Sequence, residues 1–118
     1  MATVRNFYGQ IKWFIEDNFI KDFYRRMLFI IDGNNVREFS SRFIIYCFDR
    51  DTVKDFYGRM LYLYDGQSFK NFSYQILYFY KNGTITDFYG RILYQVDGRL
   101  SNAEVALLIT LIHEGRLK

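Results

Sequence analysis

The chain of 118 residues contains no proline and only one cysteine, Cys47. A single cysteine excludes an internal disulfide framework and leaves no second thiolate for a cysteine-based metal site. His113 is the only histidine, so the sequence has no His/Cys metal spacing and no His/carboxylate cluster. Every glycine belongs to a turn signal or to the end of a helix, which excludes a glycine-rich phosphate loop. We therefore expect a protein that is not an enzyme and has no metal or cofactor.

Long apolar runs are also missing. No stretch approaches the roughly 20 residues needed to span a bilayer, and the first residues lack the apolar run of a signal peptide. The net charge of +3 is too small and too dispersed to argue for nucleic-acid binding. We expect one cytoplasmic domain, residues 1–118, with no transmembrane segment and no nucleic-acid partner.

Aromatic residues, in contrast, make up 21% of the chain and recur at a fixed spacing. Such a content favours strands and large buried contacts. Phenylalanines stand 16 or 17 residues apart at Phe7, Phe23, Phe39, Phe56, Phe72 and Phe88. This periodicity predicts six copies of one repeat, over residues of about 4–18, 19–35, 36–52, 53–68, 69–84 and 85–99.

Each repeat carries two turn signals. In the fourth repeat, Asp55 stands three residues ahead of Gly58, a spacing that suits a type I turn followed by a left-handed glycine. The same repeat closes on Asp65-Gly66, which is among the strongest short-range hairpin signals. Two turns in 16 residues predict two short strands per repeat, about twelve in all.

The last segment is different. Residues 101–104, Ser-Asn-Ala-Glu, match the helix capping box, and residues 103–112 are apolar at almost every position. We predict a helix over about 102–114, ended by Gly115. A helix that is hydrophobic all round has to be buried, and about 18 Å of helix is too short for a hydrocarbon core of about 30 Å.

The helix length is, however, close to the height of a layer of five-residue strands. We therefore predict a mainly β protein: a closed, shallow antiparallel barrel of about twelve strands, with the apolar helix in its centre. Closure is favoured over an open solenoid because it removes edge strands that would invite aggregation in so aromatic a chain.

The repeat resembles that of the β-flower proteins, bacterial repeat proteins with a Phe/Tyr-Gly-Arg-[Ile/Leu]-Leu hairpin unit and an apolar C-terminal tail. Residues 55–61 and 87–93 match best, while Ser40-Ser41 and Ser73-Tyr74 depart from the pattern. The resemblance covers residues 4–112. It implies a shallow symmetric barrel similar in architecture to the C-terminal domain of tubby-like proteins. That domain is associated with phosphoinositide and membrane binding, which extends to this chain only as a fold analogy.

When the six repeats are aligned, two positions are basic in most of them. These two positions are the most suggestive feature for function. The first position contains Arg5, Lys21, Arg37, Lys54 and Lys70, and the second contains Arg26, Arg42, Arg59 and Arg91. In a closed barrel we expect both near one turn end, beside the turn tyrosines Tyr8, Tyr24, Tyr57 and Tyr89. Cations beside exposed aromatics suit anionic lipid head groups. The structural alternative is that they pair with turn acids, as Arg59 would with Asp55.

The second strand of each repeat is apolar on both faces, and only one face can meet the helix. The other needs cover from hairpin packing, a second subunit or lipid. Our hypothesis is a module that binds membrane surfaces, peripheral to the membrane, and the alternative is a self-associating scaffold. We interpret Cys47 as a buried thiol, Trp13 as a core residue and His113 as a cation at the helix end.

Overall fold

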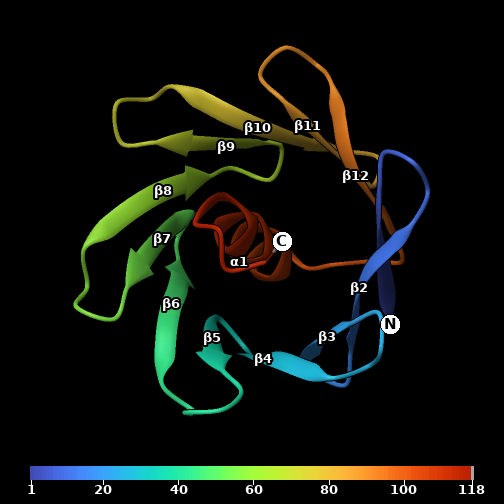
Figure 1. Cartoon of the computed structure of the whole chain (residues 1–118). Helices are drawn as coiled ribbons and strands as arrows, with labels where there is room; N and C mark the ends of the chain where they lie inside the picture. Colours follow the sequence, from blue (N-terminus) through green and yellow to red (C-terminus); the bar gives the residue numbers. More distant parts are fainter. Residues whose placement is uncertain (118) are drawn as a thin grey trace.

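The computed structural model describes residues 1–117 as twelve strands followed by one helix (Figure 1). The elements are β1 (Ala2–Asn6), β2 (Ile11–Glu16), β3 (Phe19–Asp22), β4 (Met27–Asp32), β5 (Asn35–Glu38), β6 (Ile44–Asp49), β7 (Thr52–Asp55), β8 (Met60–Tyr64), β9 (Ser68–Asn71), β10 (Ile76–Lys81), β11 (Thr84–Asp87), β12 (Ile92–Asp97) and α1 (Asn102–His113). Each predicted repeat supplies one shorter and one longer strand.

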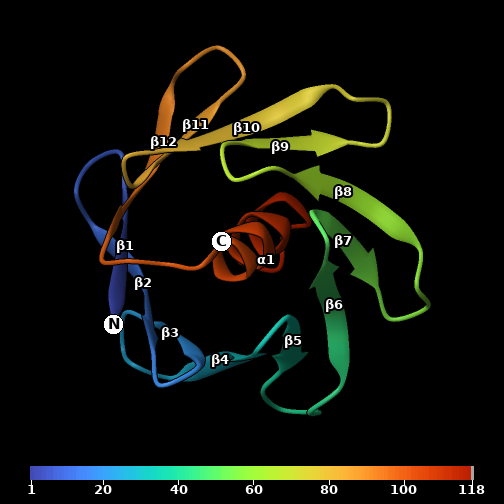
Figure 2. The same cartoon turned by 180° about the vertical axis from the view of Figure 1, so that it is seen from behind.

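The strands close into one antiparallel barrel in which every strand pairs with its neighbours in the chain. The first and last strands, β1 and β12, close it with Thr3 opposite Asp97 and Asn6 opposite Tyr94. Figures 1 and 2 show α1 running through the middle of the ring of hairpins. The prediction of a closed, twelve-stranded barrel around a C-terminal helix is confirmed.

The core lies between the inner faces of the strands and the helix. Each shorter strand turns an apolar side chain inward, namely Val4, Ile20, Val36, Val53, Phe69 and Ile85, and β1 adds Ala2. Each longer strand adds side chains such as Tyr62 and Tyr64 of β8, which alternate with outward-facing residues. Trp13 is 2% exposed, which confirms it as a core residue.

The helix is held at its start by the predicted capping box. Ser101 Oγ accepts the Glu104 backbone N–H at 3.1 Å, and the Glu104 carboxylate accepts the Ser101 N–H at 2.9 Å. Leu107, Leu108 and Leu111 are fully buried, as expected for a helix that is apolar on all sides.

Every longer strand contains a β-bulge one residue after its start. The register of β3 and β4, for example, places Ile20 opposite Phe29 and Lys21 opposite Met27, so that Leu28 is the extra residue. The extra residues of the six repeats are Lys12, Leu28, Ile45, Leu61, Leu77 and Leu93. A bulge redirects side chains, and Leu28, Ile45, Leu61 and Leu77 pack against the core at the barrel mouth.

The hairpins extend radially outward from the central helix, so the molecule is a disc of about 37 × 34 × 22 Å (Figure 1). Antiparallel strands connect alternately at two ends of the barrel. The turns at residues 7–10, 23–26, 39–43, 56–59, 72–75 and 88–91 form one end, here called the aromatic rim. The turns at residues 17–18, 33–34, 50–51, 65–67 and 82–83, with residues 98–99 after the last strand, form the opposite rim. The helix begins near Gly66 of the opposite rim and ends at the mouth of the aromatic rim.

Candidate functional site

The turns of the aromatic rim are built around one carboxylate each. In the fourth repeat, Asp55 Oδ1 accepts the backbone N–H groups of Tyr57 and Arg59, both at 2.9 Å. Asp55 Oδ2 accepts Arg59 Nε, also at 2.9 Å. The turn ends on Gly58, whose φ of 82° is the left-handed conformation predicted for it. The second and sixth repeats use the same network, through Asp22 with Arg26 and Asp87 with Arg91.

These hydrogen bonds favour the ionised carboxylate. Desolvation raises the pKa of Asp55, but the side-chain and backbone hydrogen bonds from Arg59 and the backbone of Tyr57 outweigh it, so its pKa lies below the ordinary value. The pKa values of Asp22 and Asp87 are lowered against the same desolvation by their own arginines.

The lowered pKa values predict how stability depends on pH. A carboxylate with a depressed folded-state pKa stabilises the fold above its unfolded pKa of about 4, and this contribution is lost as the pH falls through the folded-state value. The triple variant Asp22→Asn, Asp55→Asn, Asp87→Asn should therefore melt below the parent at pH 7 and approach it below about pH 3. Thermal melts across this range check the prediction.

The asparagines already in the chain show why this variant should fold. Asn6 accepts the backbone N–H groups of Tyr8 and Gln10 at 3.0 Å each, so an amide serves the turn as a carboxylate does. A melting-temperature difference that stayed constant from neutral to acid pH would contradict the role given to the charges.

The aromatic rim also carries the exposed apolar surface of the molecule. Among residues 1–117, every exposed large apolar or aromatic side chain except Met1 belongs to a turn of this rim or to the residue after it. Tyr8, Tyr24, Tyr57 and Tyr89 are 77–86% exposed, as the sequence predicted. The others are Phe7, Phe23, Met27, Phe43, Phe56, Met60, Phe72, Tyr74, Phe88 and Ile92.

Charge follows the same division between the two ends. Most acidic residues lie at or beside the opposite rim: Glu16, Asp17, Asp32, Asp49, Asp51, Asp65, Asp97 and Glu104. The aromatic rim and its mouth hold Asp22, Glu38, Asp55, Asp87 and Glu114 against Lys12, Arg25, Arg26, Arg42, Arg59, Arg91 and Arg116. The molecule is therefore polarised, with aromatic side chains and excess cations at one end and most of its carboxylates at the other.

The second group of predicted cations does lie at the aromatic rim. Arg26, Arg59 and Arg91 are 75–78% exposed at their side chains, while their aspartate partners are 13–17% exposed. Each guanidinium donates to its aspartate through Nε, which leaves the Nη groups without a hydrogen-bond partner among residues 1–117. In the third repeat, whose turn is one residue longer, Arg42 instead stacks 4.5 Å from the centre of the Phe39 ring.

The first group of predicted cations stands one residue before the end of each shorter strand, next to the turns of the aromatic rim, with its side chains on the outer wall. Arg5 and Arg37 donate to carbonyl oxygens of those turns, Gly9 O at 3.3 Å and Arg42 O at 3.2 Å. Lys70 of β9 stands directly opposite Leu63 of β8, and its Nζ is 3.9 Å from Asp65. This register places an aliphatic stem beside an outward apolar side chain and pairs the charge with an acid of the opposite rim. The same ion pairs join Arg5 to Asp97, Lys21 to Glu16, Arg37 to Asp32 and Lys54 to Asp49.

The outer wall is thereby covered from within the chain. Phe14 faces outward but is 7% exposed, and the Arg25 guanidinium lies 4.2 Å from the centre of its ring. Cys47, which we predicted to be buried, is half-buried and faces outward opposite Lys54, because Tyr46 and Phe48 take the inward positions.

Where the helix ends, tyrosines of three successive repeats hold its last polar residues. Tyr46 donates to the Glu114 carboxylate at 3.4 Å, and Tyr62 donates to the same carboxylate. Burial, followed by the hydrogen bond to Glu114, raises the pKa of Tyr62 well above its ordinary value. The Tyr78 hydroxyl lies 2.9 Å from His113 Nδ1. These contacts fix the helix end and were not predicted, because they join residues 35 to 68 positions apart.

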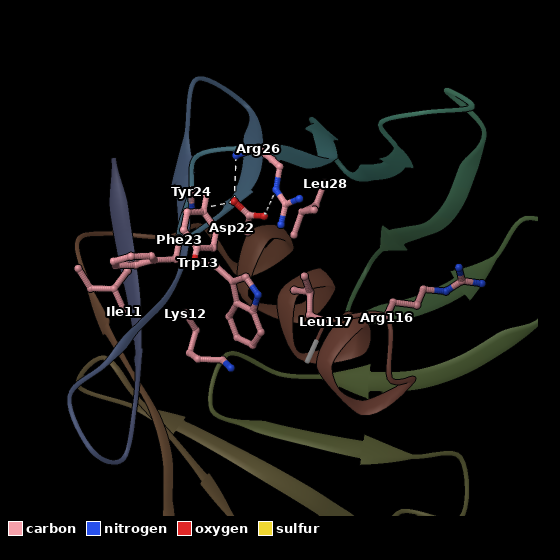
Figure 3. A pocket seen from close by; sticks show the side chains of 10 residues that line it. All are labelled: Ile11, Lys12, Trp13, Asp22, Phe23, Tyr24, Arg26, Leu28, Arg116 and Leu117. Atoms are coloured by element: carbon pink, nitrogen blue, oxygen red, sulfur yellow. Dashed lines mark hydrogen bonds and ion pairs between the residues drawn. The ribbon is translucent and has the colours of Figure 1, made fainter.

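Shallow grooves run between adjacent repeats at the aromatic rim. The groove between the first two repeats has a volume of about 320 Å³ and is lined by Trp13, Phe23, Tyr24, Leu117 and other residues (Figure 3). The groove between the third and fourth repeats, of about 290 Å³, is lined by the corresponding side chains Tyr46, Phe56 and Tyr57.

Two further features bear on function. Among residues 1–117, no group of three or more His, Cys, Asp or Glu side chains is placed to hold a metal ion. Of the helical residues described, none forms a helix long and apolar enough to cross a membrane.

Comparison with known proteins gives no relative. No family model, no curated protein and no solved structure matches the chain.

Proposed function

We propose that the protein is a non-enzymatic module that binds anionic membrane surfaces through its aromatic rim. The observation that carries this proposal is the segregation of exposed aromatic side chains to one end of a disc. Tyrosine rings suit the boundary between head groups and acyl chains, and outward guanidinium groups attract anionic lipids. Because the cytoplasmic leaflet is the anionic one, we propose a cytoplasmic protein peripheral to the membrane.

The shape of the molecule supports the same proposal. Turns from all six repeats surround one barrel mouth (Figure 2), so several of them can touch one flat surface together. Weak contacts made together from a rigid scaffold add up to a much higher effective affinity. The acids of the opposite rim would face away from the lipid, which avoids repulsion. The resemblance to β-flower and tubby-like proteins points the same way, as fold analogy alone.

Co-sedimentation with vesicles tests the proposal. The chain should bind phosphatidylglycerol vesicles more strongly than phosphatidylcholine vesicles, and less at about 1 M salt than at about 0.1 M, because the Debye length shortens from about 10 to about 3 Å. Replacing Tyr8, Tyr24, Tyr57 and Tyr89 by Ser should weaken binding by about tenfold or more, because four amphipathic anchors are lost. Absence of binding to both vesicle types would reject the proposal.

A charge-matched pair of variants separates the rim from overall charge. Arg59→Gln with Arg91→Gln removes two cations from the aromatic rim, and Arg50→Gln with Arg99→Gln removes two from the opposite rim. We expect the first pair alone to weaken vesicle binding. Equal losses in both pairs would mean that net charge, and not the rim, determines binding.

The alternative predicted from the sequence, a self-associating scaffold, would have to use the same surface. Among residues 1–117 the outer wall has no exposed large apolar side chain, so the aromatic rim is the apolar surface left for a second copy. Mass measurement in solution separates the two functions. A strictly monomeric chain removes the scaffold, and a dimer that dissociates in the four-tyrosine variant would favour it.

A further inference from the structure

One residue of the barrel mouth breaks the repeat. The bulged position is occupied by Leu28, Ile45, Leu61, Leu77 and Leu93 in five repeats and by Lys12 in the first. Four of these five, Leu28, Ile45, Leu61 and Leu77, pack against the core, which a lysine ammonium cannot do at the same cost. The structure of the repeat therefore gives no reason for a cation at this position.

Lys12 also differs from the other half-buried cations in having no acidic partner. Arg5, Lys21, Arg37, Lys54 and Lys70 all pair with a carboxylate, whereas no carboxylate among residues 1–117 forms an ion pair with Lys12. Its Nζ lies 5.9 Å from the centre of the Trp13 ring. An ammonium without an acidic partner beside an open groove favours an anion that can reach it.

The surroundings of Lys12 provide space for such an anion. It lines the groove between the first two repeats, the groove at the barrel closure and a third groove beside Arg5 and Gln10. Figure 3 shows Lys12 and Arg26 on opposite sides of the Trp13 ring, with the Arg116 side chain directed away from them. Arg26 uses Nε for Asp22, and its guanidinium carbon lies 5.7 Å from the centre of the Tyr24 ring. Its Nη groups have no hydrogen-bond partner among residues 1–117.

We propose that the groove between the first two repeats binds one phosphate-bearing head group, with its phosphate on Lys12 Nζ and the rest of the head group extending through the groove toward Arg26. This inference rests on the proposed membrane binding, which brings phospholipid head groups to the groove, and it names the ligand of one place on the rim. A phosphate on a soluble molecule carries the same chemistry.

We propose a phosphate site only between the first two repeats, because the corresponding groove between the third and fourth repeats differs in charge. Ile45 occupies the position of Lys12 there, and the Glu114 carboxylate joins Asp55 against Arg59 and Arg116. Its charges balance, whereas the groove of the first two repeats is lined by Lys12, Arg26 and Arg116 against Asp22 alone. Only the latter has an excess of positive charge for a phosphate.

The single tryptophan makes the site measurable. Trp13 lies in the groove, so inorganic phosphate bound at Lys12 should change its fluorescence, with sulfate and chloride titrations as references. Lys12→Leu restores the residue of the other repeats and should fold as the parent does. We expect it to weaken phosphate binding by about tenfold, the effect of losing one charge-assisted hydrogen bond. Lys12→Gln is the second variant, and Lys81→Gln on the opposite rim is its charge-matched control.

Binding to vesicles and binding to inorganic phosphate, measured on the same variants, distinguish a lipid phosphate from a phosphate on a soluble molecule. If Lys12→Leu and Lys12→Gln, but not Lys81→Gln, lose affinity for phosphatidylglycerol vesicles, the ligand is a lipid head group. If they lose only the response to inorganic phosphate, the site is confirmed with a soluble ligand. If both bind vesicles and phosphate as the parent does, the proposed site is overturned while the rim proposal stands. A parent that responds to phosphate but ignores vesicles rejects the rim proposal alone.

Discussion

Deletion of residues 101–118 should abolish cooperative folding. The deleted segment contains the helix that fills the barrel, including Leu107, Leu108 and Leu111, each fully buried. Without it the inner faces of twelve short strands would surround a void, and a barrel of this many strands cannot fill its interior from its own wall. We expect loss of the sharp thermal transition and of dispersed amide signals. A deletion variant that melts like the parent would refute the central role of the helix.

A milder substitution measures the same core. Leu107→Ala should lower the free energy of unfolding by about 2–5 kcal/mol, because it removes buried methyl groups and leaves a cavity. Leu93→Ala is the matched control, since Leu93 is half-buried at the barrel mouth and should cost clearly less. Denaturant unfolding of the two variants gives the comparison. Equal losses of unfolding free energy would mean that Leu107 is not at the centre of the core.

Substitution of Gly98 should be the most damaging change in a turn. Gly98 has φ of 120°, and a Cβ there would lie 2.5 Å from the Met1 carbonyl oxygen and 2.9 Å from Ala2 Cα. This contact is at the closure of the barrel, where β1 pairs with both β12 and β2. Gly98→Ala therefore has to displace β1 as well as strain the backbone, and we expect a loss of about 3 kcal/mol or more.

Gly58→Ala is the control for Gly98→Ala. Gly58 also has positive φ, but a Cβ there would meet nothing within 4 Å, so only the conformational cost of about 1–2 kcal/mol is expected. Chemical denaturation of both variants checks the difference. If the two lose the same free energy, contact across the closure does not limit stability.

The regular parts of the fold could be predicted because their signals are local. Asp55 and Gly58 specify their turn within four residues, and Ser101 and Glu104 specify the helix start in the same way. The barrel followed from these local elements because an apolar helix of fixed length needed a wall of matching height. Interpretation of Asp55 with Arg59 as a turn pair is confirmed for the same local reason.

The candidate site could be predicted only in part. The exposed tyrosines and the second group of cations, such as Arg59 and Arg91, belong to turns, so the repeat by itself places them at one end. The first group, such as Lys70, also stands beside these turns, but its ion pair with an acid of the opposite rim was not predicted, because it depends on the direction of the side chain along the outer wall. Lys12 is recognisable in the sequence as the one charged residue at a repeat position that is otherwise apolar. Its location at the barrel mouth could not be predicted, because it depends on the β-bulge at this position.

The sequence alone thus determined the repeat, its two turns, the twelve strands and the apolar helix, because each depends on residues a few positions apart. Only the tertiary structure decided which cations are neutralised on the wall and how Tyr62 holds Glu114, 52 residues away. The physical reason is that register, bulges and closure set the direction of each side chain, and these arise from strand pairs and from the joining of β1 to β12.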